Sequence, residues 1–387
     1  MKIVRFVYEW PPPWIGLAPA PYELTKAQNE LSNLITVFCA RWPKAGPLKK
    51  ISGVKIFTFF REPVMGTLLL TSAPLMTLSF LFWRLFNRVD VYHIHGHFGL
   101  YVYIYKFIFG FLDKTPIVAH FHNTVRGRKE ELKKQGKEIT PIRKFLDWPL
   151  AELSDRLAVK MSKACIFVSE SLKEQAVLYY KVDPRKCYVL ESGVNTKLFR
   201  QFSDKEKEDA KRRLGYSQSD VLILNDGFFV ERKNIHLLIE ALKYLPLEYK
   251  LMLVGKSELS YKQRLDSLID QFGLGDRVKF LGEKNYEDIP DFLRASDLYV
   301  LPSSYEGFPK TVLQSLACGV PSIASGFSLP LITGLYELTS LDAKLLADKI
   351  REVSSLNTPV DTFSVSEKYS WDVRAKKLQS IYNTLND

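Results

Sequence analysis

The residues best suited to chemistry lie in the stretch 297–325, DLYVLPSSYEGFPKTVLQSLACGVPSIAS. An apolar run ends in a short polar loop, and a helix-length segment and a second apolar run follow. Glu306 stands where the loop meets the helix, and Gln314 falls on roughly the same face of that helix. The first N–H groups of such a helix lack partners within it and carry partial positive charge, which favours a bound anion. The stretch therefore predicts a site for a phosphorylated ligand, with a simple helix cap as the alternative.

A second polar cluster lies in the segment 225–242, NDGFFVERKNIHLLIEAL. Arg232 and Lys233 stand between an apolar run and the start of a helix. Arginine offers a bidentate fork and lysine a mobile point charge, so the pair suits a diphosphate. Cations at this end of a helix oppose its dipole, which favours a ligand over the alternative of a solvated charge pair.

Histidines form a third cluster, because five of the six lie within thirty residues. They are His93, His95 and His97 in VYHIHGHFG, and His120 and His122 in VAHFHNT. Alternate residues of a strand face the same side, so each set can present several imidazoles together. Three or four such ligands can hold zinc, which would indicate a metal-dependent hydrolase. The alternative is two strand ends with histidines near a ligand cleft. We expect His97 to lie beyond its strand, and we predict no metal.

Strand and helix candidates alternate along the chain, which predicts parallel, doubly wound sheets. The first alternation has expected strands at 2–7, 34–38, 54–60, 90–94, 116–121, 164–168 and 187–190, and expected helices from residue 22 and near 66–86, 99–111, 141–162 and 170–180. The second has expected strands at 221–226, 249–254, 277–281, 297–301 and 320–324, and expected helices at 234–244, 260–272, 288–295 and 309–318. A charged run between them places a domain boundary near 195–205. Two such domains suggest a ligand in the cleft between the carboxyl ends of their strands.

The composition is that of a folded protein of two domains, with 387 residues, 46% of them hydrophobic and 25% charged. Four scattered cysteines form no CxxC pair, which predicts buried free thiols in a reducing compartment. The first ten residues, MKIVRFVYEW, are too charged for a signal peptide and read as a first strand.

The formal net charge of +11 suits nucleic acid, anionic lipid or a phosphorylated substrate. The basic stretches 126–144 and 41–55 lie close in sequence to the apolar segments 64–86 and 98–112. Basic and apolar surface together favour docking on an anionic membrane, with solvated loops as the alternative. No nucleic-acid-binding motif accompanies the charge.

One apolar segment is long enough to cross a bilayer. Residues 64–83 contain no charge over twenty positions, so the segment is either a membrane span or a buried helix. Pro74, Gly66 and several Ser and Thr residues favour the buried helix.

Several segments, in the same order, resemble the retaining glycosyltransferases of family 4, the group 1 glycosyl transferases. The resemblance runs almost from end to end. It covers KIVRFVYEWPPPWIGLAPAPYELTKA, DVYHIHGH, PIVAHFHNT, ACIFVSESLKEQ, YVLESGVNTKLF, LYVLPSSYEGFPKTVLQSLACGVPSIAS and the terminal YSWDVRAKKL. It implies the GT-B architecture, an α/β fold with two facing Rossmann-like domains and an interdomain cleft. The implied division is an acceptor domain at 1–197, a nucleotide-sugar domain at 198–366 and a helix at 367–387 that returns to the first domain.

The resemblance also implies the reaction: transfer of a hexose from a nucleotide diphosphate sugar, with retention and without a metal or other cofactor. The leaving diphosphate would act as the base, so the protein mainly positions groups and stabilises charge. Glu306 would hold donor-sugar hydroxyls, and His122 would lie near donor sugar and acceptor. The implied diphosphate-binding residues are Gly16, Arg232, Lys233 and the loop Gly307, Phe308, Pro309 and Lys310.

The sequence departs from the family pattern at three places. Gln314 stands where the family has a second acid that binds the ribose, and an amide lacks the strength of a charged acceptor. Phe228 stands where the family has an arginine, so Arg232 would supply that cation. Ser192-Gly193 replaces the usual Asn-Gly of the linker.

We therefore predict a cytoplasmic glycosyltransferase, peripheral at the inner face of the membrane, that extends a glycan or lipid-linked acceptor. The departures leave a second hypothesis, a GT-B subunit that binds sugar nucleotides or acts as a scaffold with weak catalysis. The metal-dependent hydrolase is the third.

Overall fold

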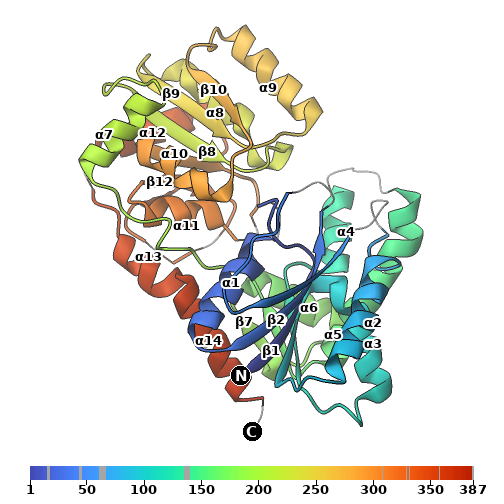
Figure 1. The fold of residues 1–387 in the computed structure, drawn as a ribbon. Helices are drawn as coiled ribbons and strands as arrows, with labels where there is room; N and C mark the ends of the chain where they lie inside the picture. Colours follow the sequence, from blue (N-terminus) through green and yellow to red (C-terminus); the bar gives the residue numbers. More distant parts are fainter. Residues whose placement is uncertain are drawn as a thin grey trace. The chain divides into compact units, whose positions relative to one another are not determined.

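The computed structural model describes residues 1–14, 18–42, 46–60, 67–134, 140–306, 308–327, 329–330, 332–356 and 358–385. The chain forms two compact units (Figure 1). Unit 1 comprises Met1–Gly193 and Trp371–Asp387, and unit 2 comprises Val194–Ser370. The boundaries thus fall after Gly193 and after Ser370, where the sequence analysis placed them after residues 197 and 366.

Unit 1 is built on a parallel sheet of seven strands in the order β3-β2-β1-β4-β5-β6-β7. The strands are β1 (Lys2–Val7), β2 (Leu34–Arg41), β3 (Lys55–Phe60), β4 (Val91–His95), β5 (Ile117–Phe121), β6 (Ala164–Phe167) and β7 (Cys187–Val189). The strand order reverses direction at β1, where β2 lies on one side and β4 on the other. At this switch point the chain segments that leave the two central strands diverge, which leaves room for a ligand at the carboxyl ends.

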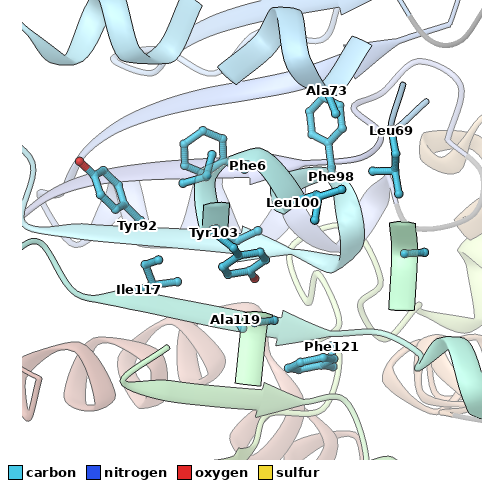
Figure 2. Close-up of a cluster of buried hydrophobic side chains, with 14 of the residues drawn as sticks. Phe6, Leu69, Ala73, Tyr92, Phe98, Leu100, Tyr103, Ile117, Ala119 and Phe121 are labelled. Atoms are coloured by element: carbon cyan, nitrogen blue, oxygen red, sulfur yellow. The ribbon is translucent and has the colours of Figure 1, made fainter. Parts of the chain in front are cut away.

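The helices of unit 1 are α1 (Pro19–Glu30), α2 (Ser72–Arg84), α3 (Leu100–Phe109), α4 (Val125–Lys134), α5 (Trp148–Met161), α6 (Glu170–Tyr180) and α14 (Trp371–Asn383). One face of the sheet packs on α2, α3 and α5, and Figure 2 shows part of that core, with Phe6, Tyr92 and Tyr103. The other face packs on α1 and α14, which lie side by side (Figure 1). The unit is therefore a three-layer α/β structure.

The C-terminal helix α14 belongs to unit 1 although the chain reaches it from unit 2. A Cβ atom on Gly193 would lie 2.6 Å from the ring of Trp371, so glycine is needed where the chain leaves unit 1. Arg374 Nη2 lies 3.3 Å from Glu191 Oε2 and ties α14 to the same segment.

Unit 2 is built on a parallel sheet of six strands in the order β10-β9-β8-β11-β12-β13. The strands are β8 (Val221–Asp226), β9 (Tyr249–Val254), β10 (Val278–Gly282), β11 (Leu298–Pro302), β12 (Ser322–Ser325) and β13 (Leu335–Glu337). The helices are α7 (Asp204–Arg213), α8 (Ile235–Ala241), α9 (Leu259–Gln271), α10 (Ile289–Ala295), α11 (Lys310–Ala317), α12 (Ala343–Ser355) and α13 (Thr362–Tyr369). Strand order reverses between β8 and β11, which places their loops together at the carboxyl edge.

The predicted α/β class with two parallel, Rossmann-like sheets is confirmed. Three of the predicted strands, 2–7, 221–226 and 249–254, agree with the structure at both ends. The predicted helix at 66–86 is shorter: it begins at Ser72, and Pro74 then lies in the first turn, where a proline costs no helical hydrogen bond.

The charged run after residue 200, read as a boundary segment, contains the helix α7. Ser203 and Glu206 form a capping box that begins this helix. The sequence analysis also did not identify α4, β13, α12 and α13 as separate elements.

Within the described ranges, no helix is long and apolar enough to cross a bilayer. Part of the candidate segment, residues 64–66, lies outside those ranges. Residues 72–83 lie in α2. One face of this helix is buried and the other is exposed, so the buried-helix alternative describes only one of its faces.

Candidate active site

The loops that follow β8 and β11 are joined by direct hydrogen bonds in unit 2. Asn234, which has a left-handed backbone, donates from Nδ2 to the Pro302 carbonyl at 2.9 Å and to Ser304 Oγ at 2.8 Å. The Ser304 amide donates to the Arg232 carbonyl at 2.8 Å. Asparagine tolerates the left-handed region better than most residues, which explains its place at this turn. The two loops therefore act as one wall at the carboxyl edge of the sheet.

Glu306 is held in this wall by two side chains. Arg232 Nη1 lies 2.9 Å from Glu306 Oε1, and Ser303 Oγ donates to the same oxygen at 2.8 Å. Arg232 also donates to the Tyr305 carbonyl at 2.7 Å, and the Glu306 amide donates to the Gly326 carbonyl at 2.7 Å. The carboxylate is largely buried and its second oxygen can accept from a ligand hydroxyl.

Lys233 is buried beside these residues, and its Nζ donates to the Asp226 carbonyl at 3.2 Å. Burial lowers the pKa of the Lys233 ammonium, against the opposing effect of the Glu306 and Asp226 charges. A Cβ atom on Gly227 would lie 2.7 Å from Lys233 Nζ, so the glycine makes room for the ammonium. The result is a desolvated cation at the end of β8, suited to a phosphate oxygen.

A buried acid lies beneath the lysine. Tyr299 Oη donates to Asp226 Oδ1 at 2.8 Å, and burial raises the pKa of this carboxyl. The Lys233 charge acts in the opposite direction. The Tyr299–Asp226 hydrogen bond thus connects β11 to β8 close to Lys233.

The remaining predicted donor residues lie at the start of α11. Phe308 packs against the core of unit 2, with its ring centroid 6.4 Å from that of Tyr369. Pro309 occupies the position before the helix without a side-chain capping hydrogen bond, and Lys310 is the first helical residue. Burial lowers the pKa of Lys310, while the Glu306 charge acts to raise it. The first amides of α11 have no partners within the helix and can bind an anion.

Of the predicted donor residues, the structure brings together Arg232, Lys233, Glu306 and Lys310, whose charges interact. Gln314 lies further along α11 and is partly exposed, and Phe228 is exposed at the end of β8. Gly16 and Gly307 lie outside the described residues. His122 follows β5 in unit 1.

Four imidazoles form a stack at the carboxyl ends of β4 and β5. The ring centroids of His93 and His120 are 5.3 Å apart with planes at 4°, and those of His120 and His122 are 4.7 Å apart with planes at 9°. The ring centroid of His95 is 4.4 Å from that of His93 and 4.6 Å from that of His120. The strand register pairs His95 with His120, which places all four on one face of the sheet.

Arg5 and Tyr382 determine where the protons of this stack lie. Arg5 Nη2 is 3.3 Å from His93 Nδ1, and Tyr382 Oη is 2.6 Å from the same atom. A guanidinium can only donate, so His93 Nδ1 accepts and the proton is on Nε2. His93 Nε2 then donates to His120 Nδ1 at 3.2 Å, which places the proton of His120 on Nε2. Burial first, and the Arg5 charge, lower the pKa of both rings well below the ordinary value.

This proton arrangement does not fit a metal centre. One nitrogen each of His93, His95 and His120 lies within 4.8 Å of the others, a spacing that would allow an ion. However, His93 and His120 each use their only free lone pair in a hydrogen bond. The buried guanidinium beside His93 would also repel a cation.

The other two histidines have different surroundings. His97 lies beyond β4, as expected, and its Nε2 is 2.8 Å from Asp155 Oδ1 on α5. Burial lowers the pKa of His97, but the carboxylates of Asp155 and Asp147 act in the opposite direction and the pKa is raised overall. His122 Nε2 is 3.0 Å from His95 Nδ1.

Both halves of the chain match sequence models of glycosyltransferases. The sequence model described as Glycosyltransferase Family 4 matches residues 16–198, and the model described as Glycosyl transferases group 1 matches residues 206–355. The chain belongs to glycosyltransferase family 4. The resemblance predicted from sequence is thereby confirmed, and the hydrolase hypothesis is replaced by a transferase.

Individual proteins that are similar in sequence to this glycosyltransferase are also glycosyltransferases. An uncharacterized glycosyltransferase of Methanocaldococcus jannaschii is 25% identical over 357 residues, 83% of this chain and 85% of the relative. The Escherichia coli enzyme named UDP-Gal:alpha-D-GlcNAc-diphosphoundecaprenol alpha-1,3-galactosyltransferase is 31% identical over 224 residues. That match spans 56% of this chain and about half of the relative, 53%.

Solved structures assign the fold. The crystal structure of Anabaena HepE in complex with UDP and glucose matches with a TM-score of 0.72 and 19% identity, covering 100% of both chains. The glycosyltransferase therefore has the GT-B fold.

Sequence reasoning missed several residues that shape the two sites. Asp226, Asn234 and Ser303 were not singled out, although the first two flank the Arg232-Lys233 pair in the sequence. Asn-Asp-Gly at the end of a strand is a usable signal for a loop at a carboxyl edge. Arg5 and Tyr382 offered no local signal, because their partners lie far away along the chain.

Proposed function

We propose that this enzyme transfers a hexose from a nucleotide diphosphate sugar to a glycan or lipid-linked acceptor, with retention of anomeric configuration. The observation that carries the proposal is the cluster of Lys233, Arg232 and Lys310 around Glu306 at the end of β8 and β11. Three cations and one carboxylate match a ligand with a diphosphate at one end and sugar hydroxyls at the other.

In the proposed reaction the diphosphate leaves as the bond to the anomeric carbon breaks, and its charge grows. Lys233 is buried, so its charge is poorly screened and stabilises the developing charge strongly. The amides at the start of α11, near Phe308 and Pro309, and the Gly16 and Gly307 backbone would complete the cradle. Glu306 accepts hydrogen bonds from donor-sugar hydroxyls and fixes the sugar.

Retention follows if the acceptor hydroxyl attacks from the face that the diphosphate leaves. The departing diphosphate then takes the acceptor proton, so the protein needs no separate base. We propose that His122, at the end of β5, orients the sugar or acceptor hydroxyl, and that the three cations replace a metal ion. Activity that survives a chelator would support the second point, and its loss with restoration by a divalent ion would oppose it.

The acceptor is proposed from the relatives and from charge. The name of the Escherichia coli relative pairs UDP-Gal with a diphosphoundecaprenol acceptor. The net charge of +11 favours association with an anionic membrane, so we propose a cytoplasmic enzyme that works at the inner membrane face.

A thermal-shift screen against a panel of nucleotide sugars tests the donor half, because a ligand that binds only the folded state raises its stability. We expect one nucleotide to raise the midpoint in the wild type and not in Lys233→Met or Glu306→Gln. A panel that shifts nothing at saturating concentration would overturn the donor proposal.

A second candidate is a subunit that binds sugar nucleotides with weak catalysis. Gln314 in place of an acid and the exposed Phe228 in place of an arginine favour it. The enzyme and the binding subunit differ in turnover. Stabilisation by a nucleotide sugar without release of nucleoside diphosphate would favour the subunit. Release that vanishes in Glu306→Gln would favour the enzyme.

A further inference from the structure

Helix α2 has two apolar faces, of which only one packs on the protein. Its inner face, with Ala73, Met76 and Phe80, is buried in the core of unit 1. Its outer face carries Leu75, Leu78 and Phe82, and Leu85 and Phe86 directly follow the helix; all five are exposed. The five recur at helical spacing, so they form one continuous stripe. A helix that is apolar all round is normally buried, which indicates that something covers the outer face of α2.

The neighbouring helix α3 also exposes apolar side chains. α2 packs on α3, and the rings of Phe80 and Tyr105 join them with centroids 6.4 Å apart. The last turn of α3 and the residues after it expose Phe107, Ile108, Phe109, Phe111 and Leu112. The two helices lie side by side at the edge of unit 1 (Figure 1). We call this surface, Leu75, Leu78, Phe82, Phe86, Phe107 and Phe111, the α2–α3 ridge.

Among the described residues of unit 2, the most exposed apolar side chains are not gathered in this way. There, the described residues Leu247, Leu259 and Phe363 are as exposed as the ridge, but they lie on three separate elements or loops. Scattered apolar residues are normal on a protein surface, whereas a contiguous patch marks an interaction site.

The charges around the ridge are cationic. From residue 72 to residue 112 the sequence contains one carboxylate, Asp90, whose Oδ2 accepts a hydrogen bond from the Lys2 amide at 2.7 Å. Arg88 and Lys114 are exposed in the segments that follow α2 and α3, and Lys160 Nζ lies 4.7 Å from the centroid of the Phe107 ring. Asp113, the next carboxylate, is buried and accepts from Tyr92 at 2.7 Å. The ridge therefore presents aromatic and aliphatic groups with a cationic border.

We propose that the α2–α3 ridge inserts into the headgroup layer of an anionic bilayer. Apolar side chains that enter the acyl boundary and cations that meet phosphate are the two components of such binding. A two-fold dimer through the ridge would instead bring its cations against one another without opposing carboxylates. The inference rests on the proposed function for its membrane setting, and adds the surface and the mode of docking. In this proposal, membrane binding depends on insertion of the apolar ridge as well as on charge. The basic stretches 41–55 and 126–144 alone would therefore not be enough for binding.

Flotation with lipid vesicles tests the ridge. The wild type is compared with Leu78→Ser/Phe82→Ser and with the matched control Leu247→Ser/Leu259→Ser, on phosphatidylcholine vesicles with and without phosphatidylglycerol. We expect the wild type and the control to bind the anionic vesicles and the ridge variant to bind at least about tenfold more weakly. Equal binding of the ridge variant and the wild type would overturn the proposal. So would a wild type that ignores vesicles and forms a dimer which the ridge variant dissociates.

Release of nucleoside diphosphate with a soluble acceptor, without lipid, separates this inference from the proposed function. The ridge variant should keep the wild-type rate, because none of its changes touches the donor residues. If vesicle binding depends on the ridge but no transfer occurs, the docking surface stands and the proposed function fails. If transfer occurs without vesicle binding, the proposed function stands and the docking surface fails.

Discussion

Arg232 Nη1 lies 2.9 Å from Glu306 Oε1, and this ion pair joins the loop after β8 to the loop after β11. Ser303 donates to the same carboxylate oxygen from within the second loop. Glu306 is therefore oriented in the absence of a ligand, and on the proposed function a sugar hydroxyl would meet a carboxylate that needs little rearrangement. The arginine has a double role, because it also adds a positive charge beside Lys233.

Arg232→Gln should weaken donor binding more than stability. The ion pair is about one-third exposed on the arginine side, so its loss costs only about 0–1 kcal/mol of unfolding free energy. We expect the KM for the nucleotide sugar to rise about tenfold, since one charge-assisted contact is lost. Arg351→Gln, which removes a surface ion pair on α12, is the control and should leave KM unchanged. An Arg232→Gln enzyme with the wild-type KM would contradict the assignment.

Lys233→Met should abolish donor binding without unfolding the protein. Burial opposes the ammonium, as its lowered pKa shows, so an apolar side chain of similar length costs the fold little. We expect an unfolding midpoint in urea equal to or above that of the wild type, and no stabilisation by a nucleoside diphosphate. Lys205→Met, at an exposed lysine of α7, should keep the stabilisation. A Lys233→Met protein that is still stabilised would contradict the role of the lysine.

The histidine stack makes stability depend on pH. Burial first, and neighbouring positive charges, lower the pKa of His93, His95 and His120 in the folded state. Below about pH 6.5 the unfolded chain binds protons at these residues that the folded chain does not, so stability falls as pH falls. The expected loss is up to about 1.4 kcal/mol per pH unit for each histidine.

Urea unfolding between pH 7.5 and pH 5, about the range in which only histidine titrates, measures this dependence. His120→Gln should lower its slope, because one titrating group is removed. His97 acts in the opposite direction: its pKa is raised by Asp155 despite burial, so its contribution is lost as pH rises. A slope that His120→Gln leaves unchanged would show that the stack is not the cause.

Tyr382→Phe tests the link between the C-terminal helix and the stack. The hydroxyl lies 2.6 Å from His93 Nδ1, an atom that Arg5 also contacts. Because Arg5 remains as a donor, we expect a loss of only about 1 kcal/mol of unfolding free energy. An unchanged urea midpoint would mean that the phenol does not stabilise the docking of α14.

Sequence periodicity predicted the sheets well, and physical reasons explain where it failed. Buried parallel strands are apolar throughout, so 221–226 and 249–254 were identified at both ends. α7 was missed because its sequence is almost entirely charged, although Ser203 and Glu206 carry the spacing of a capping box. The apolar outer face of α2 was read as a buried helix, since sequence alone does not reveal what covers a face.

The candidate site was predictable in part. Alternation along a strand correctly placed His93 and His95 on one face. Family motifs singled out Glu306 and Lys233, which the structure brings into one charge cluster. The Arg232–Glu306 pair was not predicted, because no rule of spacing connects residues of two loops that only the sheet brings together.

Release of nucleoside diphosphate from a panel of nucleotide sugars, in wild type and Glu306→Gln, tests the central claim most directly. The change keeps the size of the side chain and removes its charge, so the fold should persist. We predict acceptor-dependent release with one donor in the wild type and a rate at least about a hundredfold lower in Glu306→Gln. Release at the wild-type rate in Glu306→Gln would contradict the assignment of the donor site to the ends of β8 and β11.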